Sequence, residues 1–109
     1  HLVVADCSSV LGLMPFNIGQ YGVVIASTEH SLGIVGCTVV IVREDLIVAN
    51  KQIPSMFSFE VMLRTSSIFN TPNCFSVYVL GKYVKYLLDT YQGLQQVHKK
   101  MTEIHKSIS

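Results

Sequence analysis

The sequence predicts an α/β fold in which strands come first and helices last. The first half contains three continuous apolar runs, none of which alternates apolar with polar residues. Residues 1–42 contain no Lys or Arg, and their only acids are Asp6 and Glu29. From residue 73 onward, apolar residues recur at three- and four-residue steps, which is the period of an α-helix.

Three strands are expected, at residues 2–5, 23–26 and 38–42. Continuous apolar runs bounded by glycine and polar residues are typical of strands buried on both faces, as in parallel sheets covered by helices. The connections between the runs are marked by glycines at positions 12, 19, 22, 33 and 36. We therefore expect mainly parallel, buried strands.

The middle of the chain has a weaker pattern. Asp45 is expected to cap a short helix over residues 46–49. Residues 51–71 show no sustained period, with Pro54 inside and Pro72 just after them, and are predicted to form a long ordered connection.

Two helices are predicted in the last third. Asn73 follows Pro72 as an N-cap, and the helix it starts should end near Gly93. Its apolar positions are Phe75, Tyr78, Val79, Tyr83 and Leu87. The second helix is amphipathic, with Leu94, Val97, Met101, Ile104 and Ile108 on one side and Gln96, Lys99, Lys100, Glu103 and Lys106 on the solvent side.

Composition excludes several classes of protein. The 109 residues are 50% hydrophobic and 14% charged with a net charge of +1, the reverse of a disordered chain. The longest apolar stretch, residues 75–88, is interrupted by Lys82 and Lys85 and is shorter than the roughly 20 residues that cross a bilayer. A near-neutral charge argues against a nucleic-acid partner. The chain is one small domain or a piece of a larger one.

The cysteines indicate the compartment. The chain has an odd number of cysteines, Cys7, Cys37 and Cys74, and they form no CxxC pair. We therefore expect these cysteines to be small buried hydrophobic residues, in a protein from the reducing environment of the cytoplasm. The chain starts at His1 without a basic segment or a small-residue cleavage site, so it is expected to be processed, trimmed or excerpted, without a visible signal peptide.

Two helices give too little cover for three strands buried on both faces. Large apolar patches would remain exposed. We infer that the segment sits inside something larger, either more of its own chain or a partner subunit.

Four motifs carry a resemblance to a known family. They are Asp6-Cys7-Ser8-Ser9, residues 21–26 (YGVVIA), residues 33–46 (GIVGCTVVIVREDL) and residues 69–72 (FNTP). In this order and spacing the chain resembles the phosphoserine aminotransferases, class V pyridoxal-phosphate enzymes of serine biosynthesis. The register holds without gaps over residues 6–46 and continues into the helix at residues 74–88. The resemblance covers nearly all of the chain but less than a third of the family's usual length.

The resemblance implies part of a fold-type I large domain. In the family, a mainly parallel sheet lies between helices, the enzyme is a dimer, and pyridoxal phosphate sits at the carboxyl ends of the strands. Strands and cofactor-site loops should then occupy about residues 1–72 and helices residues 73–109 of a single segment. The family reaction moves an amino group between glutamate and 3-phosphohydroxypyruvate.

Asp6 matches the carboxylate that keeps the cofactor's pyridine nitrogen protonated, as this chemistry requires. As an isolated aspartate after an apolar strand, Asp6 could instead cap a turn. In the family, the pair matching Asn70 and Thr71 reaches across the dimer to the other subunit's cofactor phosphate.

His30 stands where the family has its Schiff-base lysine. The family reads Gly-Ala-Gln-Lys-Asn, whereas this chain reads Ser-Thr-Glu-His-Ser over residues 27–31. An imidazole makes no stable imine with the cofactor aldehyde, and no lysine precedes Lys51. Glu29 replaces a glutamine beside the cofactor phosphate and adds like-charge repulsion. Val10 and Met14 also depart from the family pattern, and we assign them no role.

Other roles for His30 have less support. His1, His98 and His105 are remote in sequence and suggest no metal-ligand set. A nucleophile pair with Cys37 is disfavoured because Cys37 opens an apolar strand, where a buried thiol is the default. We therefore expect no catalytic residue and no metal in this chain.

Two functions remain open. The first is a degenerate aminotransferase with the family fold and without transamination. The second is an interaction module that pairs with itself or with an intact family subunit through residues 64–72, with no nucleic-acid or membrane partner. A lysine at position 30 of the source gene would restore the enzyme interpretation.

Overall fold

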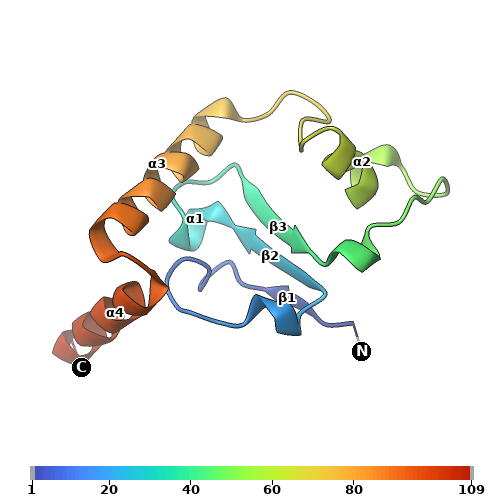
Figure 1. Ribbon diagram of the computed structural model, residues 1–109. Helices are drawn as coiled ribbons and strands as arrows, with labels where there is room; N and C mark the ends of the chain where they lie inside the picture. The colour runs from blue at the N-terminus through green and yellow to red at the C-terminus, as the bar shows by residue number, and fades with distance from the viewer. Residues whose placement is uncertain (1, 109) are drawn as a thin grey trace.

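Three short strands form the centre of the chain (Figure 1). The computed structural model describes residues 2–108. Strands β1 (Val4–Asp6), β2 (Val23–Ser27) and β3 (Thr38–Val42) lie side by side in the order β1-β2-β3. The three apolar runs of the sequence therefore all form strands.

The sheet is mixed. β1 and β2 run parallel, with Asp6 opposite Ile25, whereas β2 and β3 run antiparallel, with Ser27 opposite Thr38. A parallel pair needs a crossover of about a dozen residues or more, and the connection at residues 28–37 only turns the chain back. The prediction of a mainly parallel sheet is therefore wrong for β3, although the α/β class is correct.

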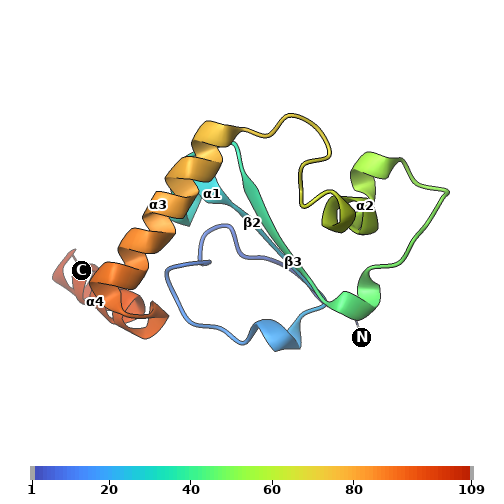
Figure 2. The same cartoon turned by 45° about the horizontal axis from the view of Figure 1, so that its top comes forward.

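Burial on both faces applies to β2 alone. Val23, Val24 and Ala26 of β2 are buried, but Val4 of β1 is 57% exposed and Val40 of β3 is 42% exposed. The cause is the placement of the helices: α3 and α4 lie to one side of the sheet and α2 to the other (Figure 2). The outer strands consequently remain open, as the shortage of covering helices predicted.

The two long helices are confirmed. Helix α3 spans Cys74–Tyr91 and α4 spans Leu94–Ile108. The Asn73 side chain caps α3 by accepting a hydrogen bond from the Ser76 amide at 3.1 Å, and Gln92, with φ of 56°, ends it in the left-handed conformation.

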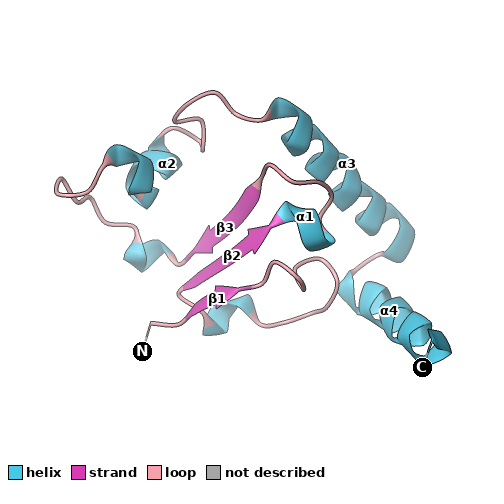
Figure 3. Cartoon of the chain, turned by 180° about the vertical axis from the view of Figure 1, so that it is seen from behind, coloured by secondary structure: helices cyan, strands magenta, loops and turns pink. Residues whose placement is uncertain are grey.

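Several short elements were not predicted. Helix α1 (Thr28–Ser31) follows β2 directly, and α2 (Phe59–Arg64) lies inside the expected connection (Figure 3). Residues 2–108 also contain three short 3-10 helices: η1 (Ile18–Gln20), η2 (Glu44–Leu46) and η3 (Ser55–Phe57). The signal for α2 is Ser58, whose hydroxyl accepts a hydrogen bond from the Val61 amide at 3.3 Å.

The expected helix at residues 46–49 is wrong. The helical turn begins two residues earlier, as η2, and Asp45 lies inside it. The Asp45 carboxylate accepts two hydrogen bonds from the Arg43 guanidinium, which prevents it from acting as a cap.

Helix α3 is attached to the loops at the ends of the strands. The Ser76 hydroxyl donates a hydrogen bond to the Val35 carbonyl at 2.8 Å. The second attachment is at Leu87, which lies against Gly12, where an added Cβ would stand 3.8 Å from the Leu87 side chain. These two contacts fix α3 beside the candidate site.

The chain exposes more surface than a folded domain of its size. Its accessible surface is 8061 Å², against about 6,000 Å² for a compact monomer of this mass. The radius of gyration is 16.0 Å, against about 13 Å for a compact domain of this length. The largest exposed apolar side chains include Phe57, Leu63 and Phe75. Among the described helices, none is long and apolar enough to span a membrane.

The cysteines are only partly as expected. All three are free, but only Cys7 is buried, while Cys37 is half-buried and Cys74 is exposed. Cys74 is the first residue of α3 and is exposed there. The prediction of three buried thiols is wrong for these two.

Candidate functional site

The candidate site lies at the edge of the sheet where β1 and β2 both end. Because these strands are parallel, their carboxyl ends meet at one edge, which brings Asp6 and helix α1 together. Glu29 and His30 are both on α1. The structure therefore places three of the five sequence-predicted cofactor residues in one region.

Asp6 ends β1 with its carboxylate fixed by one residue. Its Oδ1 accepts a hydrogen bond from the Ser8 amide at 2.9 Å and another from the Ser8 hydroxyl at 2.7 Å. Asp6 therefore caps the turn that follows β1, whether or not it also pairs with a cofactor. Within residues 2–108, no hydrogen bond reaches the second oxygen, Oδ2.

Asp6 is held in its ionised form. The hydroxyl and amide of Ser8 lower the pKa of the Asp6 carboxyl below its usual range, and the charge of His30 adds a smaller effect in the same direction. Asp6 thus presents a carboxylate with one oxygen engaged and the other available to a donor.

A serine network that the sequence analysis missed surrounds Asp6. The Ser8 hydroxyl accepts a hydrogen bond from the Ser27 amide at 2.9 Å. The hydroxyl of Ser31, which is buried, lies 3.0 Å from the Ser8 carbonyl and 2.7 Å from the Leu11 carbonyl. These contacts tie the turn after β1 to the end of β2 and to α1. They join residues 19 to 23 positions apart, so no local pattern reveals them.

Glu29 and His30 form an exposed pair. His30 Nε2 lies 3.5 Å from Glu29 Oε1, and the two side chains are 58% and 42% exposed. Both point outward because Thr28 and Ser31 occupy the buried side of the four-residue helix. This is an ion pair only when His30 is protonated.

Within residues 2–108, neither a third metal ligand nor a cysteine nucleophile joins the pair formed by His30 and Glu29. No group of three His, Cys, Asp or Glu suited to a metal occurs among residues 2–108, and His1 lies outside them. Within the same residues, no hydrogen bond joins His30 to Cys37, whose carbonyl instead accepts from Thr28.

Asn70 and Thr71 lie in the connection between α2 and α3. Both are exposed, and neither makes a hydrogen bond to Asp6, Glu29 or His30 in the described chain. The structure therefore does not bring this pair into the cluster at the sheet edge.

The described residues fit pyridoxal phosphate only at its ring nitrogen. The open Oδ2 of Asp6 suits a protonated pyridine nitrogen. His30 has no primary amine for the aldehyde, and Glu29 stands where the resemblance implies the phosphate, which has like charge. The site thus does not fit covalent attachment of this cofactor.

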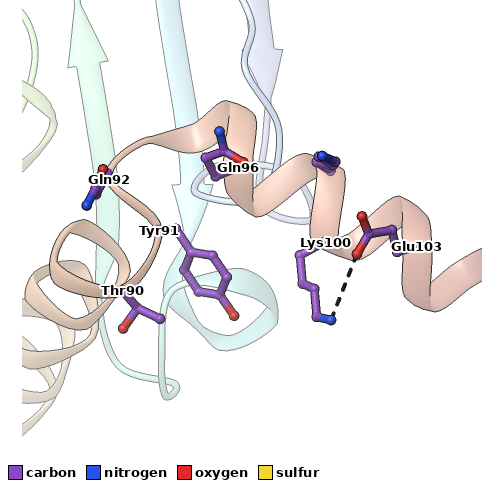
Figure 4. A pocket seen from close by; sticks show the side chains of 7 residues that line it. Thr90, Tyr91, Gln92, Gln96, Lys100 and Glu103 are labelled. Carbon is purple, nitrogen blue, oxygen red and sulfur yellow. Dashed lines mark ion pairs between the residues drawn. The ribbon is translucent and has the colours of Figure 1, made fainter.

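Two cavities lie away from this cluster. One, of about 370 Å³, is lined by polar side chains where α3 meets α4, including Tyr91, Gln96 and Lys100 (Figure 4). Lys100 is engaged there, with its Nζ 3.9 Å from Glu103 Oε2. The other, of about 440 Å³, is mainly apolar and is lined by residues 66–68, Pro72, Cys74, Val77 and Tyr78.

Comparison with known proteins agrees with the fold and the motifs. The family model described as aminotransferase class-V matches residues 1–109. A phosphoserine aminotransferase from Niallia circulans is 33% identical over 105 residues, which is 94% of this chain and 29% of the relative.

Solved structures are similar as well. A phosphoserine aminotransferase from Bacillus circulans subsp. alkalophilus superposes with a TM-score of 0.84 at 34% identity, over 91% of this chain and 27% of that one. A pyridoxal-phosphate-bound phosphoserine aminotransferase from Trichomonas vaginalis shares the fold, with a TM-score of 0.87 at 22% identity, over 98% of this chain and 32% of that one. The chain thus spans about a third or less of the length of these relatives. It belongs to the class V aminotransferase family and is similar over its length to phosphoserine aminotransferases.

Proposed function

We propose that this chain is a phosphoserine aminotransferase-like segment that does not catalyse transamination. The observation that carries the proposal is His30 on α1, at the sheet edge that also holds Asp6. The resemblance assigns the Schiff-base lysine to this position. The family reaction, amino transfer between glutamate and 3-phosphohydroxypyruvate, therefore lacks its nucleophile here.

The surroundings of His30 support the proposed loss of transamination. No lysine precedes Lys51, and no hydrogen bond or ion pair of a lysine in the described chain reaches Asp6 or α1. Glu29 lies 3.5 Å from the imidazole and makes the position acidic, which opposes a phosphate dianion. The loss of the amine and the repulsion of the phosphate both weaken binding of pyridoxal phosphate.

Borohydride reduction tests the proposal. The chain is incubated with pyridoxal phosphate, reduced and digested, and its peptides are analysed by mass spectrometry, with an intact phosphoserine aminotransferase as the positive control. We expect no visible absorption band that reduction removes and no cofactor fixed to residues 27–31. A reducible band with label on this peptide would overturn the proposal.

A second candidate function is pairing with another aminotransferase subunit. The mainly apolar cavity of about 440 Å³ supports it, because Ile68 and Pro72, which line the cavity, flank Asn70 and Thr71 in the sequence. The resemblance places this pair at the neighbouring subunit's cofactor phosphate. A chain that has lost its own nucleophile but keeps these residues is suited to a homodimer or to a heteromer with an intact subunit.

Co-expression with an intact phosphoserine aminotransferase tests the pairing. We expect recovery of a heteromer, and a change in the intact enzyme's activity that Asn70→Ala with Thr71→Ala removes. Gln95→Ala with Thr102→Ala, on the exposed surface of α4, is the matched control and should have no effect. If no heteromer forms and the Asn70 and Thr71 variants match the unmutated chain, the pairing proposal fails.

A further inference from the structure

Ser8 takes over the pairing between β1 and β2 at the point where β1 ends. The last backbone hydrogen bond of this pair runs from the Cys7 amide to the Ile25 carbonyl at 2.7 Å. Two residues further on, the Ser27 amide donates to the Ser8 hydroxyl at 2.9 Å instead of to a backbone carbonyl. A side chain has replaced the acceptor that a longer strand would supply.

The same hydroxyl donates to Asp6. The Ser8 Oγ lies 2.7 Å from Asp6 Oδ1, and the Ser8 amide lies 2.9 Å from the same oxygen. Ser8 thus accepts from one strand end and donates to the other. The two bonds to Oδ1 restrict the rotation of the carboxylate, and no hydrogen bond within residues 2–108 engages Oδ2.

The turn that carries Ser8 is itself anchored to α1. The hydroxyl of Ser31, only 5% exposed, lies 3.0 Å from the Ser8 carbonyl. Ser31 follows Glu29 and His30 on the same short helix. Movement of α1 would therefore be transmitted to the Asp6 carboxylate through Ser8.

We propose that Ser8 is a positioning residue for Asp6, fixing the rotation of its carboxylate with Oδ2 left open to a donor and coupling that orientation to the helix bearing Glu29 and His30. The charged groups that face Asp6 are few. His30 acts on it electrostatically, and Glu29 faces His30. The inference rests on the proposed function only for the location of the site.

The carboxyl titration of Asp6, followed by NMR in the full chain without cofactor, tests the proposal. In Ser8→Ala the Asp6 pKa should rise toward the ordinary aspartate value, because both the hydroxyl bond and the tight turn are weakened. Ser8→Thr keeps a hydroxyl and should restore the low value. Ser9→Ala, at the exposed neighbouring position, is the matched control and should leave the titration unchanged.

The second readout is amide exchange at Ser27, on the other strand. Ser8→Ala should accelerate it about tenfold, the effect of losing one hydrogen bond, and Ser8→Thr should not. If Ser8→Ala does not fold, Ser8→Cys, whose thiol is a weak donor, should give an intermediate Asp6 pKa. A destabilised Ser8→Ala chain with an unchanged Asp6 titration would overturn the proposal. Borohydride reduction is not involved, so this failure is distinct from failure of the proposed function.

Discussion

Ser76 and Val35, 41 residues apart, are joined by a hydrogen bond of 2.8 Å from the Ser76 hydroxyl to the Val35 carbonyl. Ser76 is 2% exposed and lies in the first turn of α3, while Val35 is in the loop between α1 and β3. One buried hydroxyl therefore attaches the longest helix to the segment that follows the candidate site.

Ser76→Ala should lower the free energy of unfolding by about 1 to 3 kcal/mol, because it leaves the Val35 carbonyl without its partner. The urea midpoint is measured in the assembly state the chain adopts, at one protein concentration. Ser107→Ala, on exposed α4, should change the free energy by less than about 0.5 kcal/mol. If the two substitutions changed the free energy of unfolding equally, the bond from Ser76 would not be what attaches α3.

Gly36→Ala should also weaken this attachment. Gly36 has a φ of 115°, and an added Cβ would stand 2.4 Å from Asn73 Nδ2 and 2.6 Å from Ser76 Oγ. The cost should exceed about 1 kcal/mol, from strain and displacement of the cap. Gly81→Ala, inside α3 with open space around it, should instead stabilise by about 0.5 to 1 kcal/mol. Thermal unfolding should therefore show a lower midpoint for Gly36→Ala and a higher midpoint for Gly81→Ala.

Local signals explain which elements the sequence predicted. Helix α3 has a cap at Asn73 and eighteen residues of periodic pattern, so its start was predictable to the residue. Helix α1 has four residues, less than two turns, and carries no period that a reader could detect. The direction of β3 follows from the connection at residues 28–37, which is too short for the crossover that a parallel strand would need.

The candidate site was predictable only in part for a similar reason. Asp6 and the residues after β2 share an edge because both follow parallel strands, and strand ends can be read from apolar runs. The role of Ser8 depends on bonds to Ser27 and Ser31, which become neighbours only once the strands pair. The interpretation of His30 came from the family resemblance and not from any local pattern.

Acid should destabilise the chain partly through Asp6. Its folded-state pKa lies below the unfolded one, so the ionised carboxylate stabilises the folded chain fully above the unfolded pKa, and this contribution is lost as the pH falls through the lower folded pKa. Asp6→Asn should flatten the acid part of a plot of unfolding midpoint against pH. Because hydrogen bonds from Ser8 are the main cause, added salt should leave most of the effect in place. If added salt removed this acid destabilisation, the charge of His30 would instead be its main cause.

The isolated chain should not behave as a stable monomer. Phe57, Leu63 and Phe75 are each at least 65% exposed, and the total surface exceeds that of a compact domain. Sedimentation velocity should show self-association or aggregation. Phe57→Ser with Phe75→Ser should increase the monomer fraction, whereas Lys51→Ser should not. Sharp, dispersed amide resonances from the unmutated chain at monomer mass would contradict this.

Restoring the family residues beside Asp6 should restore capture of pyridoxal phosphate. His30→Lys supplies a primary amine at the end of α1, and Glu29→Gln removes the negative charge that lies 3.5 Å from that position. The double variant should retain the cofactor about tenfold better than the unmutated chain, a gain of about 1.4 kcal/mol. Equilibrium dialysis measures retention, and borohydride reduction followed by peptide mapping locates the label at residue 30.

Two further variants make this outcome specific. His98→Lys places the same amine on α4, away from Asp6, and should give no gain. Asp6→Ala, added to the restored pair, should remove most of the gain, because the ring nitrogen then has no carboxylate to hold its proton. If the restored pair binds no better than His98→Lys, Asp6 is not placed as the resemblance implies, and the site at the end of β1 is a structural turn cap alone.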